Sequence, residues 1–198
     1  MDTESRINEL DRAIMGCKMC KLYTGRTNTV PGYGRTEKVE IVIVGEAPGR
    51  NEDLEGKPFV GSGGKLLDEL LQNAGLNRDD LYITNIVKCR PPENRKPEPD
   101  EVETCTKNYL DRQLEILKPR LIVTLGATAL EYFTGKTKMG ESHGKVMMTK
   151  YGIPLLPTYH PAAVFRTRSY RDLLQKDLMA IRAILARTGD KQADLTSF

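Results

Sequence analysis

Four short apolar runs, separated by segments with helical periodicity, organise most of this chain. The runs cover residues 39–45, 81–87, 121–125 and 153–158. Nearly continuous apolar runs of this length are typical of strands buried on both faces of a sheet. Strand, loop and helix then alternate along the chain, an order that predicts an α/β protein with a parallel sheet covered on both sides.

Amphipathic periodicity marks the helices. The expected helices cover residues 3–16, 66–71 (closed by Gly75), 102–117, 127–133 and 174–185. Residues 90–99 hold four prolines and are expected to form an irregular loop. We find no internal repeat and no linker, so residues 1–198 should form one domain, with a short flexible tail from about residue 188.

The composition is that of an ordinary globular protein whose C-terminal part is basic. Hydrophobic residues make up 39% of the chain, charged residues make up 29%, and the net charge is +3. Residues 160–187 alone carry a net charge of +4, which fits a polyanionic partner, although a solvated helix face has the same composition. No apolar run approaches the length that spans a membrane, so we expect a cytoplasmic protein without a membrane partner.

The chain has four cysteines, Cys17, Cys20, Cys89 and Cys105. Thiols stay reduced in the cytoplasm, so this quartet favours a metal site over disulfides. Paired zinc knuckles would show a second tight CxxC turn, whereas an iron–sulfur cluster needs only four thiolates that converge in space. Buried free cysteines and a redox CxxC are the alternatives, although Cys17 and Cys20 end a helix and do not lie at the mouth of a βαβ unit.

The first polar cluster follows the strand at residues 39–45 and extends from Gly45 to Gly64. Its glycines allow a ligand to approach the backbone closely, but neither GxxxxGK[ST] nor GxGxxG is present, which argues against a nucleotide cofactor. The carboxylates of Glu46, Glu52 and Asp53 can position a water molecule or stabilise a developing cation. Phe59 is either a core residue or a flat surface on which a base stacks.

Two further polar residues lie at or near strand ends. Asn85 is an amide within an apolar strand, and it either makes a structural hydrogen bond or reads the edge of a ring. A fixed amide that accepts from one ring atom and donates to the next fits the N3–H and O4 of uracil and mismatches cytosine. His160 follows the last strand and precedes Pro161, a placement that favours a functional role, whereas His143 lies among small polar residues and is expected in a surface loop.

Together these segments resemble the family 4 uracil-DNA glycosylases, which contain an iron–sulfur cluster. The resemblance extends from Cys17 to about Arg187 and rests on the cysteine quartet and three motifs. The motifs are GEAPGRNEDLEGKPFVG at residues 45–61, TNIVKCRPPENRKP at residues 84–97 and HPAAVFR at residues 160–166. It implies a three-layer α/β/α sandwich with a central four-stranded parallel sheet, and a structural 4Fe–4S cluster held by Cys17, Cys20, Cys89 and Cys105.

The resemblance also implies roles for individual residues. Phe59 stacks on the flipped uracil, Asn85 reads its pairing edge, and His160 donates to its O2 atom. Glu46, with the backbone around Ala47, positions the attacking water or stabilises the sugar cation, and Asn94 contacts that water. Glu52 crowds the thymine methyl group. The implied uracil-binding set is Glu46, Ala47, Pro48, Glu52, Phe59, Asn85 and His160. The most active branch of the superfamily has an aspartate in place of Ala47, so leaving-group stabilisation carries more of the catalysis here.

The basic C-terminal part is implied to bind DNA. The DNA-binding set is Val164, Phe165, Arg166, Arg168 and Arg171. Val164, Phe165 or both form the wedge that fills the vacated stack. The implied function is excision of uracil from single- or double-stranded DNA by a monofunctional enzyme, which leaves an abasic site.

Two other classes stay open from the residues alone, a binding module for uracil-containing DNA and an iron–sulfur electron carrier. We expect a monomer. The tail at residues 193–198 ends in an aromatic residue and leaves a sliding clamp open as a partner.

Overall fold

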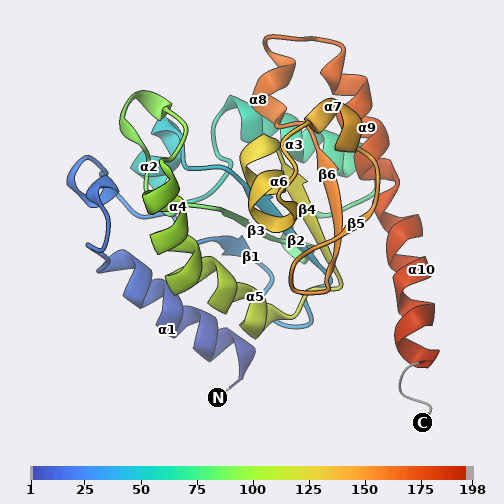
Figure 1. Ribbon diagram of the computed structural model, residues 1–198, viewed down its shortest axis with the longest axis horizontal. Coiled ribbons are helices and arrows are strands. Elements are labelled where there is room, and N and C mark those ends of the chain that lie inside the picture. The colour runs from blue at the N-terminus through green and yellow to red at the C-terminus, as the bar shows by residue number, and fades with distance from the viewer. Residues whose placement is uncertain (1, 195–198) are drawn as a thin grey trace.

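A computed structural model describes residues 2–194 of the chain (Figure 1). Six strands form one sheet in the order β1-β3-β2-β4-β6-β5. They are β1 (Tyr33–Gly34), β2 (Ile41–Gly45), β3 (Tyr82–Asn85), β4 (Leu121–Leu125), β5 (Met147–Met148) and β6 (Pro154–Thr158). The four central strands pair in parallel, and β1 and β5 pair antiparallel at the two edges. The expected α/β/α fold with four parallel strands is therefore confirmed.

Helices cover both faces of the sheet. They are α1 (Thr3–Met15), α2 (Arg50–Glu55), α3 (Ser62–Asn73), α4 (Pro99–Cys105), α5 (Asp111–Leu117), α6 (Ala127–Thr134), α7 (Met139–Ser142), α8 (Pro161–Val164), α9 (Tyr170–Met179) and α10 (Ile181–Asp194). Figure 1 shows α6 in front of the sheet and α3 behind it. Within the described residues, no helix is both long enough and apolar enough to cross a bilayer.

Alternate side chains of each central strand enter two separate cores. Val42 and Val44 of β2 pack with α1, α5 and α6, whereas Ile41 and Ile43 pack with α3, α9 and the start of α10. This alternation is the period-2 geometry of a strand, and burial on both faces explains why the central strands are mostly apolar on both sides.

Local sequence signals fix the helix ends that matter for the site. α3 buries Leu66, Leu67, Leu70 and Leu71, and the chain leaves it through Gly75 at φ +71°, a conformation that favours glycine. A π-helical turn at Thr106–Leu110 joins α4 to α5, so the segment expected as one helix is continuous but carries a local distortion. Cys105 lies on its buried side, as predicted.

Several expectations about the elements were incomplete. The edge strands β1 and β5 have two residues each, too few for a hydrophobic pattern to reveal. The last expected helix is divided at Ala180 into α9 and α10, and α10 continues to Asp194, beyond the expected start of the tail near residue 188. Residues 195–198, which include the aromatic end of that tail, lie outside the described part of the chain.

Candidate active site

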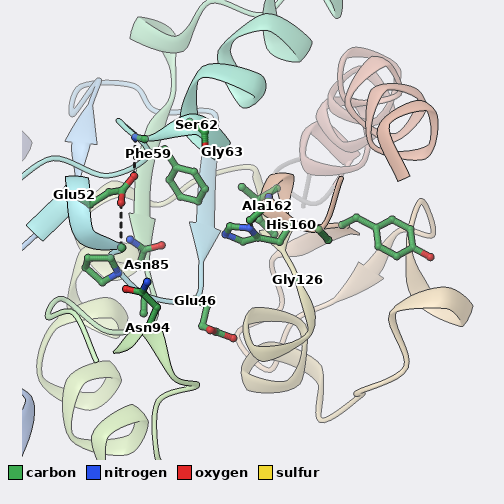
Figure 2. Close-up of a pocket in the computed structure, with 18 of the residues that line it drawn as sticks. Glu46, Glu52, Phe59, Ser62, Gly63, Asn85, Asn94, Gly126, His160 and Ala162 are labelled. Carbon is green, nitrogen blue, oxygen red and sulfur yellow. Dashed lines mark hydrogen bonds between the residues drawn. The ribbon is translucent and has the colours of Figure 1, made fainter. Parts of the chain in front are cut away.

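A single cavity of about 800 Å³ opens at the carboxyl ends of the central strands. The polar cluster at residues 45–64, Asn85 and His160 meet in it because each lies at or after the end of a different parallel strand. Its lining includes every residue that the sequence predicted for catalysis or uracil binding: Glu46, Ala47, Pro48, Glu52, Phe59, Asn85, Asn94 and His160. Figure 2 shows Phe59, Asn85 and His160 around one space.

Asn85 is the last residue of β3 and is buried, with 1% of its surface exposed. Its side-chain oxygen Oδ1 has no hydrogen-bond partner in the protein. A buried amide oxygen without a partner is rare, because the lost hydration is not replaced. The structural hydrogen bond considered for Asn85 is therefore absent at this atom, which stays available to a ligand.

Phe59 is held over the same space by a strained backbone. Its φ of +53° lies in the left-handed region, which is uncommon for an aromatic residue and typical of functional sites. Two glycines permit this placement. A Cβ on Gly64 would lie 1.8 Å from the carbonyl oxygen of Phe59, and a Cβ on Gly45 would lie 2.6 Å from the Phe59 ring and 2.4 Å from Oδ1 of Asn85. The close approach of Phe59 and Asn85 thus requires glycine at position 45.

His160 lies across the cavity from Asn85 and precedes α8. The backbone N–H of Ala162 donates to its Nδ1 at 3.1 Å. Removal from water lowers the pKa of His160 from 6.5 to about 4, opposed by the charge of Glu52. The imidazole is therefore neutral at physiological pH, and because Nδ1 accepts a hydrogen bond, the proton is on Nε2. Its ring centroid lies 5.6 Å from that of Phe59.

Glu46 follows β2, and its carboxylate points away from Phe59 and Asn85 (Figure 2). The hydroxyl of Thr128 in α6 donates to it. The sequence reading did not identify Thr128, because the Gly126–Thr128 segment after β4 contains only small residues. A Cβ on Gly126 would lie 3.3 Å from Cβ of His160, so this turn also packs against the histidine.

Glu52 lines the cavity, but its carboxylate is engaged by the protein. Oε2 accepts from the N–H of Gly49 at 3.1 Å, and Oε1 accepts from the N–H groups of Val60 and Gly61 at 3.0 and 2.9 Å. These bonds cap α2 and tie it to the loop that carries Phe59 (Figure 2). The geometry gives Glu52 a positioning function, and its contact with the base stays a prediction.

Asn94 closes the cavity from the proline-rich loop. Its φ is +56°, its side chain is exposed, and its Oδ1 accepts from Nε of Arg90 at 2.7 Å. The same loop is anchored by Arg95, whose guanidinium makes two hydrogen bonds with the fully buried carboxylate of Glu101. Arg95 holds the pKa of Glu101 below its usual value.

The residues predicted to bind DNA differ in accessibility. Phe165 is 61% exposed, whereas Val164 is 8% exposed and packs in the core beneath α8. Val164 is thus not available as a wedge in this conformation, which corrects that alternative. Arg166 and Arg168 are exposed, and Arg166 lines the cavity. Arg171 forms an ion pair with Glu69 of α3 at 2.5 Å.

His143 lies in the turn after α7, as expected, but its side chain is engaged by the protein. His143 is half-buried, and its Nδ1 lies 3.2 Å from the carboxylate of Asp177 in α9. The same carboxylate accepts from the hydroxyl of Thr158 at 2.7 Å. Asp177 therefore holds the end of β6, two residues before His160.

All four cysteines are unpaired and line one small cavity between α1 and α4. Burial raises the pKa of Cys20 and Cys89, and raises the pKa of Cys105 to about 12. Two donors face the sulfurs: Nη1 of Arg26 lies 3.0 Å from Sγ of Cys89, and the N–H of Lys88 lies 3.3 Å from Sγ of Cys105. Without a metal these buried thiols would be neutral. Two N–H donors, one of them on a guanidinium, instead suit thiolates that are bound to a metal.

Among residues 2–194, no set of three or more His, Cys, Asp or Glu side chains is arranged to hold a single metal ion. The four sulfurs are the donor set that an Fe4S4 cluster requires, and a cluster separates its ligands farther than one ion does. The residues present therefore fit a cluster.

Comparison with known proteins identifies a family. Residues 31–182 match the family described as the uracil DNA glycosylase superfamily. A type-4 uracil-DNA glycosylase of Sulfurisphaera tokodaii is 47% identical over 93% of this chain and 86% of its own length. Those of Archaeoglobus fulgidus and Thermotoga maritima are 44% and 40% identical over 97% and 96% of this chain, and over 98% and 100% of their own lengths.

Proposed function

The chain belongs to the uracil DNA glycosylase superfamily, in its type-4 branch, and excises uracil from DNA by hydrolysing the N-glycosyl bond. We propose which of its residues perform this reaction. Of the three classes that the residues alone left open, the protein is therefore the enzyme. The single observation that supports our assignment is that Asn85, Phe59 and His160, from three distant segments, line one cavity.

Base recognition comes from Phe59 and Asn85. The flipped base stacks on the Phe59 ring, which backbone strain and Gly64 hold in place. The free Oδ1 of Asn85 accepts from N3–H of uracil, and its amide N–H donates to O4. Cytosine presents an acceptor at N3 and a donor at C4, so it would leave both groups of the buried amide unpaired.

Leaving-group stabilisation comes from His160. As the N-glycosyl bond lengthens, negative charge develops on the uracil ring and positive charge on the sugar. The neutral imidazole donates from Nε2 to O2 of the departing uracil. A neutral donor keeps its proton while it stabilises the anion, so no proton transfer is needed at this step.

Glu46 acts on the sugar cation and on the attacking water. Its carboxylate is oriented by Thr128 and faces the cavity without blocking the base site. A carboxylate there stabilises an oxocarbenium-like sugar and orients a water for attack on it. Ala47 supplies no second carboxylate. Asn94 reaches the same water with its amide N–H, because its oxygen is already bonded to Arg90.

DNA is held along α8 and the residues that follow it. Phe165 enters the stack that uracil leaves, and Arg166 and Arg168 contact the flanking phosphates. Arg171 contributes less, because Glu69 already pairs with its guanidinium. The chain has no described lysine placed for a Schiff base in the cavity lining, so we expect an abasic product without strand cleavage.

A 4Fe–4S cluster on Cys17, Cys20, Cys89 and Cys105 is the cofactor that these residues suit. Its four iron–thiolate bonds would cross-link the segment after α1, the segment after β3 and the end of α4. Arg26 and the N–H of Lys88 stabilise the thiolate charge. We also propose a monomer that works in the cytoplasm, where thiols stay reduced; a clamp contact through residues 195–198 lies outside the described chain.

The decisive experiment is single-turnover excision from a uracil-containing oligonucleotide by Asn85→Ala, His160→Ala and the unchanged protein. Each substitution should lower the rate about 100-fold or more. His143→Ala, which changes the other histidine of the chain, is the matched control and should stay near the unchanged rate. Full activity in both Asn85→Ala and His160→Ala would show that another site performs the chemistry.

A further inference from the structure

A lysine ammonium is buried beneath the carboxyl end of β3. Lys88 is 1% exposed, and its Nζ donates to Oγ1 of Thr84 at 2.6 Å, to the backbone oxygen of Asn85 at 2.8 Å and to Oε1 of Gln113 at 2.7 Å. An ammonium has three N–H groups, so these acceptors satisfy it completely. A buried charge is otherwise strongly unfavourable, and its retention here needs a reason.

The acceptors are themselves fixed by a second layer of bonds. The hydroxyl of Thr84 donates to the backbone oxygen of Pro31 at 2.7 Å. Nε2 of Gln113 donates to the same oxygen and to the hydroxyl of Tyr82, both at 3.0 Å. The network therefore connects β3, α5 and the loop before β1, and it leaves Nζ of Lys88 little freedom to move.

The carbonyl of Asn85 has no strand partner that could replace Lys88. In the parallel ladder, the oxygen of Gly45 accepts from the N–H of Ile86, so the carbonyl of Asn85 points away from β2. On that side the edge strand β1 pairs only with Tyr82 and Ile83. The sheet holds Asn85 on the β2 side, and the lysine holds its carbonyl on the other side, beyond the end of β1.

The buried Oδ1 of Asn85 makes no hydrogen bond, so the orientation of the side chain comes from packing against Gly45 and from the position of its own backbone. We propose that Lys88 is a positioning residue for uracil recognition: its ammonium fixes the carbonyl of Asn85 and thereby orients the amide that reads the base. This inference rests on the proposed role of Asn85. A purely structural role for Lys88 would instead lower stability without changing how the base is read.

The test compares Lys88→Met with the unchanged holoprotein. We expect the affinity for free uracil and the single-turnover excision rate to fall roughly tenfold to a hundredfold, the effect of losing a hydrogen bond with a charged partner. Affinity for an oligonucleotide with a tetrahydrofuran abasic analogue should stay within about twofold, because phosphate contacts and not Asn85 hold that DNA. Iron content and the visible spectrum show that the cluster is retained.

Two further variants isolate the contact. Tyr82→Phe removes one bond at the far end of the network and leaves the Lys88–Asn85 bond in place, so it should keep the uracil affinity. In an Asn85→Ala background, Lys88→Met should add less than about a twofold further loss, because the residue that it positions is gone. If Lys88→Met does not fold, Gln113→Met replaces it: it removes one of the three acceptors that fix Nζ of Lys88 and should also weaken uracil binding, whereas Tyr82→Phe controls for the Gln113–Tyr82 bond that it removes as well.

The outcomes separate the two proposals. Full excision by Asn85→Ala overturns the proposed role of Asn85 and this inference with it. If Asn85→Ala impairs excision, the inference alone is overturned by any of three results: unchanged uracil affinity in Lys88→Met (or in Gln113→Met where Lys88→Met does not fold), equal losses for uracil and for the abasic DNA, or additive losses in the double variant.

Discussion

Replacing His160 by alanine tests the central electrostatic step. The variant loses the Nε2–H donor that we propose faces the departing uracil, and it leaves the side chains of Phe59 and Asn85 unchanged. Removing one preorganised donor to a developing anion costs about 2.7–4 kcal/mol, which corresponds to roughly a 100- to 1,000-fold lower rate. Single-turnover excision with enzyme in excess measures this step without interference from product release.

The pH dependence of the unchanged enzyme refines the test. The pKa of His160 is lowered to about 4, so the imidazole is neutral from pH 8 down to about pH 5. The excision rate should therefore show no acid limb with a midpoint near 6.5. Such a limb, absent from the His160→Ala variant, would refute the neutral donor and indicate an imidazolium.

Protein stability gives an independent check with a defined sign. The folded-state pKa of about 4 lies below the unfolded value of 6.5, so the unfolded chain binds more protons between these values. The free energy of unfolding should fall as the pH drops from 6.5 towards 4, by about 3 kcal/mol in total at 1.36 kcal/mol per pKa unit. Denaturant melts should show this fall, and His160→Ala should show a smaller one; equal slopes in the two proteins would contradict the buried neutral state.

Three other outcomes follow from the geometry. Gly45→Ala places a Cβ 2.4 Å from Oδ1 of Asn85, so excision should drop more than about tenfold and stability by about 1–3 kcal/mol, measured by single-turnover kinetics and denaturant melts; near-normal kinetics would contradict the close packing. Phe165→Ala should slow excision from double-stranded DNA more than from single-stranded DNA, because only the duplex leaves a stack to fill; equal effects would argue against a wedge. Cys105→Ser should lose iron, the brown colour and several degrees of Tm, and a colourless unchanged protein would contradict the cluster itself.

The sequence predicted the architecture because its signals are local. Burial on both faces makes a strand mostly apolar along its length, and this marked all four central strands. The period-3.6 pattern marked α1 and α3 in the same way. The strands β1 and β5 have two residues each, too few for a hydrophobic pattern, and they were recognisable only from their pairing with β3 and β6. The break between α9 and α10 at Ala180 is also not marked by the hydrophobic pattern.

The residues of the site were also identifiable as candidates, since a polar residue at the end of an apolar strand is unusual wherever it occurs. Their interactions were not. Nothing local distinguishes Glu52, whose carboxylate is bonded to three backbone amides, from Glu46, whose carboxylate accepts from the hydroxyl of Thr128. Val164 and Phe165 are neighbours of similar character, yet one is buried and the other exposed.

The sequence alone therefore determined the helix and sheet layers of the fold, the cysteine quartet and the strand ends at which chemistry is possible. Tertiary structure alone decided that Asn85 keeps an unpaired oxygen, that Nδ1 of His160 is occupied, and that Lys88 supports Asn85 from below. The physical reason is range: periodicity depends on neighbours a few residues apart, whereas hydrogen-bond saturation and burial depend on atoms that packing brings together from distant segments.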